Sequence, residues 1–275
     1  MRWWTGAVML ALAGGPGTPA VPGPDYEVYA IQYAQLKGFP ANALVLGAEA
    51  SRKVDLSMMV WLLRGEGRVI LVDAGFYRQQ FLDAWKVVDF VKPSDAVARF
   101  GVKPEQVTDV VITHLHWDHA DGADLFPNAR VWVQRDEFEH YRKPENLARS
   151  GVFPDDIAMF EKIEREGRLH LVPGDSQTIA RGVTVFTGGR HTRESQYLTA
   201  WTREGLAVIA SDNVYLYENI ARHRPIAATW DTVSNLAAQD RMIRMAGGDR
   251  LVVPGHDPAV FKRFKVTAPG VARIE

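Results

Sequence analysis

The sequence Val110-Val111-Ile112-Thr113-His114-Leu115-His116-Trp117-Asp118-His119 contains four potential metal ligands within six residues. The run from Val107 to Thr113 is short and β-branched and follows a Pro-containing turn, which is typical of a buried strand. Side chains two apart lie on one side of an extended chain, so His114 and His116 would point the same way if the strand conformation continues. The segment can therefore present two imidazoles to one ion and an Asp/His pair to a neighbouring ion.

This pattern, His-x-His-x-Asp-His, resembles the signature of the metallo-β-lactamase superfamily. A loop that is rich in histidine by chance is the alternative, but His and Asp are the usual ligands of hydrolytic zinc sites and the spacing is specific. The resemblance covers nearly the whole chain from about Tyr26 onward. Further candidate ligands follow in the order of that family: His191 after Gly189-Arg190, Asp212 between Ser211 and Asn213, and His256 after Pro254-Gly255.

The resemblance implies a centre with two divalent metal ions. One ion would be bound by His114, His116 and His191. The other would be bound by Asp118, His119 and His256, and Asp212 would bridge the two ions through its two carboxylate oxygens. Zinc is the expected metal, although Mn, Fe and Co also suit these ligands. The Asp of Asp73-Ala74-Gly75 would support the ligands from behind, and a turn or cap aspartate is the equally open alternative.

The segment Asp212-Asn213-Val214-Tyr215 matches the N-acyl-homoserine lactonase-like branch of this family best. In that branch the matching Tyr hydrogen-bonds to the lactone, so Tyr215 would help to stabilise the oxyanion; a buried aromatic is the alternative. The resemblance implies that a hydroxide bridging the two ions attacks the lactone carbonyl, and that Asp212 or a water returns the proton to the ring oxygen. Asp118 is the third candidate catalytic residue.

The expected function is therefore a metal-dependent hydrolase that opens a lactone ring, with N-acyl-homoserine lactones (quorum quenching) as the main candidate substrates. The same site would also suit 4-pyridoxolactone, an aryl ester, a phosphotriester or a β-lactam, since the fold does not choose the substrate. Ser195 stands where the lactonases have a second His, and Arg190 and Arg193 add charge that suits a carboxylate-bearing lactone. Both Arg side chains would otherwise point to solvent or pair with Glu194.

A metal-binding module without catalysis is a further interpretation, which a count of two ions per chain would argue against. The net charge of -1, without a basic run, argues against a nucleic-acid groove or a polybasic membrane surface. The chain contains no cysteine, so neither a disulfide nor a thiolate ligand is available. Homologous lactonases are often dimers, and a homodimer is left open.

Residues 1–20 are expected to form a signal peptide. Arg2 supplies a positive charge, residues 3–13 are apolar, and Thr18-Pro19-Ala20 resembles a cleavage site. The apolar stretch is too short for a convincing membrane span. A periplasmic or secreted location follows from this interpretation, and a disordered or wrongly assigned start is the alternative. Residues 21–275 are expected to form a single hydrolase domain of the metallo-β-lactamase fold.

The hydrophobic pattern predicts an α/β protein, and the resemblance implies a four-layer αββα sandwich. Hairpin-returning strands end in Asp at Asp73 and at Asp212, which indicates two related halves. Residues 36–53 are expected to form an irregular loop, which lines the substrate cleft in lactone-hydrolysing relatives. A helix is predicted over residues 79–91, with Ser94 as the N-cap of the next one. Five tryptophans are expected in the core: Trp61, Trp85, Trp132, Trp201 and Trp230.

Overall fold

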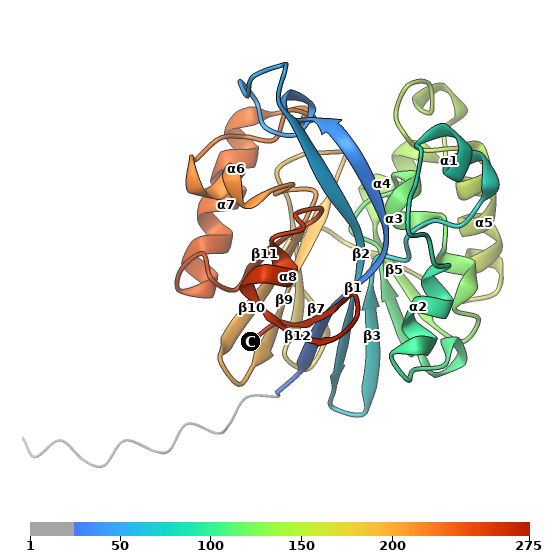
Figure 1. Ribbon diagram of the computed structural model, residues 1–275. Helices are drawn as coiled ribbons and strands as arrows, with labels where there is room; N and C mark the ends of the chain where they lie inside the picture. The colour runs from blue at the N-terminus through green and yellow to red at the C-terminus, as the bar shows by residue number, and fades with distance from the viewer. Residues whose placement is uncertain (1–24) are drawn as a thin grey trace, which may run out of the picture.

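Two β-sheets pack face to face and carry helices on their outer faces, so the layers follow the predicted order αββα (Figure 1). This computed structural model describes residues 25–275, and the predicted signal peptide lies outside the described residues. Across residues 25–275, none of the helices combines the length and apolar character that a membrane span requires.

The first sheet has eight strands in the order β12-β13-β1-β2-β3-β4-β5-β6. Strands β3 to β6 are parallel to one another, and the other neighbours are antiparallel. The bounds are β1 Glu27–Pro40, β2 Lys53–Gly65, β3 Arg68–Val72, β4 Asp109–Val111, β5 Arg130–Gln134, β6 Leu169–Val172, β12 Lys265–Ala268 and β13 Val271–Arg273.

The second sheet has five strands in the order β11-β10-β9-β8-β7, and only the pair β10 and β11 is parallel. The bounds are β7 Gln177–Ala180, β8 Val183–Thr187, β9 Gln196–Thr202, β10 Gly205–Ser211 and β11 Val252–Pro254.

Most helices cover the outer face of one sheet or the other (Figure 1). The α-helices are α1 Gln79–Ala84, α2 Pro93–Arg99, α3 Trp117–Ala120, α4 Arg135–Tyr141, α5 Pro154–Arg165, α6 Tyr217–Ala221, α7 Thr232–Ala246 and α8 Val260–Arg263. Short 3-10 helices lie at η1 Ala41–Ala43, η2 Pro104–Gln106, η3 Ala123–Leu125 and η4 Pro144–Asn146. Helix α7 begins at an N-cap, Asp231, whose carboxylate accepts the backbone N–H groups of Val233 and Ser234.

One core lies between the two sheets, where fully buried side chains such as Trp61 and Val72 of the first sheet belong to one cluster with Ile209 of the second. A strand that is covered on both faces needs a nearly continuous apolar sequence, and residues 56–63 of β2 have one, interrupted only by Ser57. Two further clusters lie under the helices on either side.

The topology brings the signature loops together. The parallel strands β3 and β4 run in one direction, so the segments that follow them, with Asp73 and His114, emerge at the same edge. The parallel strands β10 and β11 do the same for Asp212 and His256. Loops at the carboxyl ends of neighbouring parallel strands are a common place for a functional site.

Some predicted boundaries were wrong. Strand β1 continues to Pro40, paired with Lys53, so only part of residues 36–53 is irregular. The predicted helix over residues 79–91 ends at Ala84, because Lys86 and Asp89 have positive φ and Val88 forms an extended bridge to Gln35. Ser94 lies inside α2, which begins at Pro93, a residue whose fixed φ suits the first helical position.

The prediction that all five tryptophans lie in the core was also wrong. Trp61 is fully buried, whereas Trp85, Trp201 and Trp230 are 42%, 48% and 54% exposed. The ring of Trp85 stacks on Trp117 and on Phe39 near the signature loop, with ring centroids 5.5 and 6.2 Å apart. Trp85 therefore belongs to the neighbourhood of the candidate site.

Candidate metal centre

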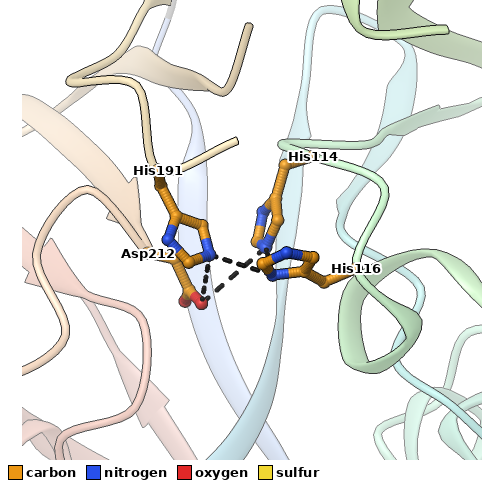
Figure 2. A group of neighbouring side chains, drawn as sticks. All are labelled: His114, His116, His191 and Asp212. Atoms are coloured by element: carbon orange, nitrogen blue, oxygen red, sulfur yellow. Dashed lines mark hydrogen bonds and ion pairs between the residues drawn. The ribbon is translucent and has the colours of Figure 1, made fainter. Parts of the chain in front are cut away.

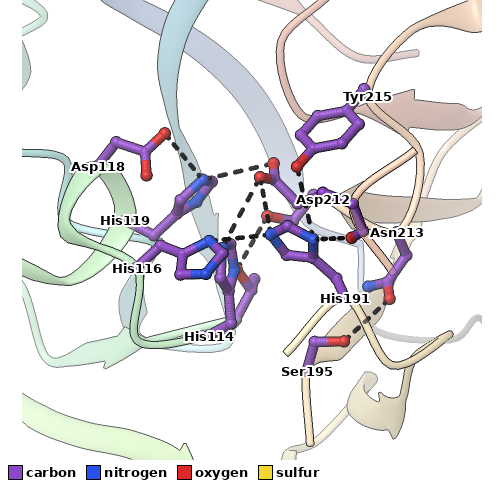
Figure 3. A network of polar contacts seen from close by, with 12 residues as sticks. His114, His116, Asp118, His119, His191, Ser195, Asp212, Asn213 and Tyr215 are labelled. Carbon is purple, nitrogen blue, oxygen red and sulfur yellow. Dashed lines mark hydrogen bonds and ion pairs between the residues drawn. The ribbon is translucent and has the colours of Figure 1, made fainter. Parts of the chain in front are cut away.

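Seven His and Asp side chains meet where the loops of both sheets converge. Figure 3 labels all of them except His256. They form two groups whose nitrogen and oxygen atoms lie close enough to bind a metal ion each. The first group is His114, His116, His191 and Asp212, and the second is Asp118, His119 and His256. All the residues that the sequence predicted as ligands are thus brought together, and their binding of metal stays a prediction.

Three imidazoles of the first group point at one another (Figure 2). His116 Nδ1 lies 3.1 Å from His114 Nε2 and 3.0 Å from His191 Nε2. Asp212 Oδ2 lies 3.7 Å from His114 Nε2 and 3.4 Å from His191 Nε2. The four atoms surround a common point.

The second group lies on the other side of the Asp212 carboxylate. Asp118 Oδ2 is 3.5 Å from His119 Nε2 and 3.6 Å from His256 Nε2. Asp212 Oδ1 is 3.4 Å from His119 Nε2 and 3.0 Å from His256 Nε2. Asp212 therefore turns one carboxylate oxygen toward each group.

Hydrogen bonds behind the imidazoles fix which ring nitrogen faces the centre. The Nδ1 atoms of His119 and His191 each lie 2.7 Å from an acceptor, Asp73 Oδ2 and the carbonyl oxygen of Ala228 respectively. His256 Nδ1 lies 3.3 Å from the carbonyl oxygen of Ser57. A ring that donates its Nδ1–H keeps a lone pair on Nε2, which is the form that binds a metal.

Asp73 connects both halves of the centre. This fully buried side chain also accepts the backbone N–H of Thr113 at 2.7 Å and the hydroxyls of Thr113 and Ser211 at 2.9 and 3.1 Å. Its φ of 58° is in the left-handed region, which Asp and Asn tolerate better than other non-glycine residues. Of the two interpretations left open by the sequence, the contacts favour support of the ligands.

The charges differ between the two groups. Burial, followed by the proximity of His191, lowers the pKa of His116 to about 3, and the pKa values of His114 and His191 are also lowered. Burial alone would lower the pKa of His119, but the carboxylates of Asp212 and Asp118 raise it well above its ordinary value. The imidazoles of the first group are therefore neutral at pH 7.

This arrangement fits a pair of bound cations. Neutral imidazole nitrogens 3.0–3.1 Å apart in the first group turn lone pairs toward one another, and a metal ion is the natural partner for them. His119 Nε2 and Asp212 Oδ1 are buried and make no well-directed hydrogen bond within the described part of the chain, although they lie 3.4 Å from each other and Asp212 Oδ1 lies 3.0 Å from His256 Nε2. Buried polar atoms of this kind need a partner, and an ion at the second group, which both atoms face, would supply it.

A cavity lined mainly by apolar side chains opens onto the second group. It reaches the candidate ligands Asp118, Asp212 and His256, and also His116 of the first group, and its further lining includes Tyr215, Trp85 and Trp117. Its apolar wall comes from β1, β2 and the segment between them: Leu36, Phe39, Ala43, Leu44, Leu56 and Met58. Residues 36–53, which the resemblance assigned to a substrate cleft, thus contribute to this wall.

A second, more polar cavity opens onto the first group. It reaches His116 and His191 and is lined farther out by His140, Arg149 and Trp230, among others. Neither Arg190 nor Arg193 is among the residues that line these two cavities.

Tyr215 and Ser195 lie on opposite sides of His191 (Figure 3). The Tyr215 hydroxyl is 3.5 Å from His191 Nδ1, and burial together with the carboxylates of Asp212 and Asp118 raises its pKa well above 10. The hydroxyl of Ser195 donates to Asn213 Oδ1 at 3.2 Å, so it supports the loop and does not join the ligands.

Sequence reasoning missed two kinds of residue. Four residues that line the apolar cavity belong to no sequence motif, and only tertiary packing brings them there: Phe39, Leu56, Met58 and Trp85. The buried carboxylate of Glu137 was also not recognised, because nothing in the sequence distinguishes it from an ordinary exposed acidic residue near a helix N-terminus.

Comparison with known proteins agrees with this centre. A family model described as the metallo-beta-lactamase superfamily matches residues 56–256. An N-acyl homoserine lactonase of Bacillus cereus is 25% identical over 229 residues, which cover 77% of this chain and 86% of that protein. An N-acyl homoserine lactonase AttM of Rhizobium johnstonii is 29% identical over 192 residues, which cover 66% of this chain and 70% of that protein.

The fold has close structural neighbours as well. A crystal structure of a quorum-quenching N-acyl homoserine lactone lactonase matches with a TM-score of 0.73 at 21% identity, covering 90% of this chain and 98% of the other. The predicted fold class, the resemblance to the lactonase branch and the expectation of a hydrolase are confirmed. Since the family model spans most of the sequence and the two-sheet fold agrees with it, the chain belongs to the metallo-beta-lactamase superfamily.

Proposed function

We propose that the chain is a dinuclear, zinc-dependent lactonase that opens the ring of N-acyl-homoserine lactones. The observation that carries this proposal is the position of Asp212, whose Oδ1 faces Asp118, His119 and His256 while its Oδ2 faces the three histidines of the other group. A carboxylate that turns one oxygen toward each of two ligand groups is suited to bridge two dications. The names of the curated relatives support the lactone as substrate.

When bound, the two ions would supply an activated water as nucleophile and would withdraw charge from the carbonyl group under attack. The chain itself would contribute Tyr215, which lies beside Asp212 and His256 in the lining of the apolar cavity. Because its pKa is raised well above 10, the phenol keeps its proton and can donate it in a hydrogen bond to the developing oxyanion. Asp118 would hold its place beside His119 and His256, and Asp212 or a water would return the proton to the ring oxygen.

The shape of the approach favours a substrate with an apolar arm. The cavity beside Tyr215 is lined by Leu36, Phe39, Leu56 and Met58, which can bury a hydrocarbon chain while the ring lies at the ligands. A carboxylate-bearing lactone such as 4-pyridoxolactone would need a cation in this lining. Arg190 and Arg193, the candidates for that role, line neither cavity, and Arg149 lines only the polar one, so the acyl lactone is the better fit for the apolar cavity.

The experiment is to follow acid release from an acyl-homoserine lactone by the purified protein, with 4-pyridoxolactone in parallel and with a chelator as control. Turnover of the acyl lactone that the chelator abolishes and that zinc restores is the expected result, together with two ions per chain by elemental analysis. Turnover of 4-pyridoxolactone alone would contradict the substrate, and a count of one ion would contradict the dinuclear centre. Failure with both lactones would direct the search to aryl esters, phosphotriesters and β-lactams.

The proposal includes a site of action outside the cytoplasm, based on the predicted signal peptide over residues 1–20. N-terminal sequencing of the protein recovered from the periplasm or the medium tests it. A mature chain that begins near Val21 is expected, and a cytoplasmic protein that retains Met1 would contradict it.

A further inference from the structure

A buried carboxylate outside the ligand set lies between the two loops that supply the three histidines. Glu137 belongs to α4, which follows β5 directly, and its side chain is fully buried. Most buried carboxylates in proteins are paired with a cation or bound to a metal. Glu137 therefore calls for an explanation.

The two oxygens of Glu137 bind different loops. Oε1 accepts the backbone N–H of Leu115 at 3.1 Å, and Leu115 stands between His114 and His116. Oε2 accepts the backbone N–H of Glu194 at 2.7 Å, three residues after His191. One rigid carboxylate thus connects the His114/His116 segment of the first half to the His191 segment of the second.

Glu137 has no cationic partner in the described part of the chain. Burial raises its pKa to about 7, and the backbone N–H groups of Glu194 and Leu115 act against this effect. No Lys, Arg or His is among the groups that shift it. A carboxylate held mainly by backbone N–H groups contributes geometry, because each N–H fixes the position of the loop to which it belongs.

We propose that Glu137 is a positioning residue that sets the spacing between the two loops of the three-histidine group and so determines the metal affinity of that group. This inference rests on the proposed two-ion centre. His116 Nδ1 must stay close to both His114 Nε2 and His191 Nε2, and these two histidines come from loops far apart in the sequence. The Glu137 carboxylate is a direct link between those loops.

A second link keeps the fold intact when Glu137 is changed. Gln134, at the end of β5, donates from Nε2 to Gln196 Oε1 at 2.9 Å, and Gln196 donates from its own Nε2 to the carbonyl oxygen of Ile112 at 2.7 Å. The backbone N–H of Gln196 also donates to the carbonyl oxygen of Thr113 at 2.8 Å. The loss of Glu137 should therefore loosen the loops without separating the sheets.

The other group has supports of its own. Tyr33 donates its hydroxyl to the carbonyl oxygen of Asp118 at 3.1 Å. Asp73 accepts His119 Nδ1, and the carbonyl of Ser57 faces His256 Nδ1. A change at Glu137 should therefore weaken one ion selectively, which a general loss of stability would not do.

The test compares Glu137→Gln with the wild-type chain by zinc titration against a competing chelator. The amide has the size of the carboxylate, but its NH2 group would face a backbone N–H, so one of the two loops loses its acceptor. Glu139→Gln is the matched control, because Glu139 lies on the same helix, is exposed, and pairs only with Arg142 among the described residues. Glu137→Asp, whose shorter side chain cannot reach both N–H groups, is the second variant in case the first does not fold.

We expect one of the two ions to bind about tenfold or more weakly in the Glu137 variants, the size of effect seen when supports behind a ligand are removed. The other ion should keep its wild-type affinity, and Glu139→Gln should bind both as the wild type does. Equal affinities in the wild type and the Glu137 variants, or an equal loss of both ions, would overturn the role of Glu137. A single ion in the wild type would instead contradict the dinuclear centre.

Discussion

Replacement of Asp73 by Asn tests whether the hydrogen bond between Asp73 and His119 fixes the orientation of this candidate ligand. Asn has nearly the same shape as Asp and tolerates the φ of 58° found at this position. The variant exchanges one carboxylate oxygen for an NH2 group, in a side chain that accepts from Thr113 N, Thr113 Oγ1, His119 Nδ1 and Ser211 Oγ. The new amide can satisfy the first contact with its oxygen but then turns a donor toward His119.

The consequence can be estimated. The His119 Nδ1–Asp73 Oδ2 distance of 2.7 Å is that of a charge-assisted hydrogen bond. Such a bond contributes about 1.5–3 kcal/mol, which corresponds to about 10- to 150-fold in a binding constant. In the variant, His119 is driven toward the tautomer that carries its proton on Nε2, and the lone pair that faces Asp118 and Asp212 is lost. The ion at the second group should therefore bind about 10- to 100-fold more weakly.

The assay is a zinc competition titration, with thermal unfolding recorded in the presence of zinc and in the presence of a chelator. In the chelator, the melting temperatures of the variant and the wild type should be similar. In zinc, the variant should melt at a lower temperature than the wild type, because the lost interaction acts mainly on the metal-bound state. Asp83→Asn, at an exposed position on α1, is the control. Wild-type zinc affinity in Asp73→Asn would refute the reasoning.

Three further perturbations have defined outcomes. Tyr215→Phe should lower kcat about 100-fold, because the hydrogen bond to the oxyanion is lost. The zinc content should stay unchanged, because the hydroxyl lies 3.5 Å from His191 Nδ1, which does not face the ligand group. An unchanged kcat would exclude Tyr215 from oxyanion stabilisation. Trp85→Ala should raise KM for long-chain lactones about tenfold, the equivalent of about 1.5 kcal/mol of lost apolar contact, and should affect short chains less; equal effects on both would argue against an acyl groove. Burial and the charge of Asp121 raise the pKa of Asp156 to about 7 against the opposing effect of Arg78, whose Nη1 lies 2.6 Å from Asp156 Oδ1, so the folded Asp121/Asp156 pair keeps a proton that the unfolded chain releases above about pH 4. The stability that this proton contributes is present at pH 4 and is lost as the pH rises to 7. The free energy of unfolding in urea should therefore fall less between pH 4 and 7 for Asp156→Asn than for the wild type. Parallel pH curves for the two proteins would contradict the raised pKa.

Local pattern was sufficient where one short segment carries the whole signal. The strand before His114 and the hairpin between β2 and β3 depend on alternation and turn residues, which the sequence displays directly, whereas the candidate ligands as far as His256 were identified through the family resemblance. The four-layer arrangement followed from the family resemblance, because no local pattern states how two sheets pack.

The errors occurred where tertiary contacts override a local preference. The periodic apolar residues over 79–91 are typical of a helix, but pairing of Val88 with Gln35 extends the chain there. Trp85 satisfies that same helical pattern and yet lies beside the candidate site, stacked on Trp117. Glu137 could not be recognised, because its role depends on two N–H groups from segments that meet only in the folded chain.

The two halves of the chain contribute to both ligand groups: His114 and His119 come from the first, and His191 and His256 from the second. Each bound ion would therefore close a long loop of the chain and act as a reversible cross-link between the two sheets, reducing the entropy of partly opened states. Such a cross-link exists only while metal is supplied, since binding stabilises the folded form according to the free ion concentration. Zinc in the surroundings would then govern how long each molecule survives proteolysis as well as whether it is active.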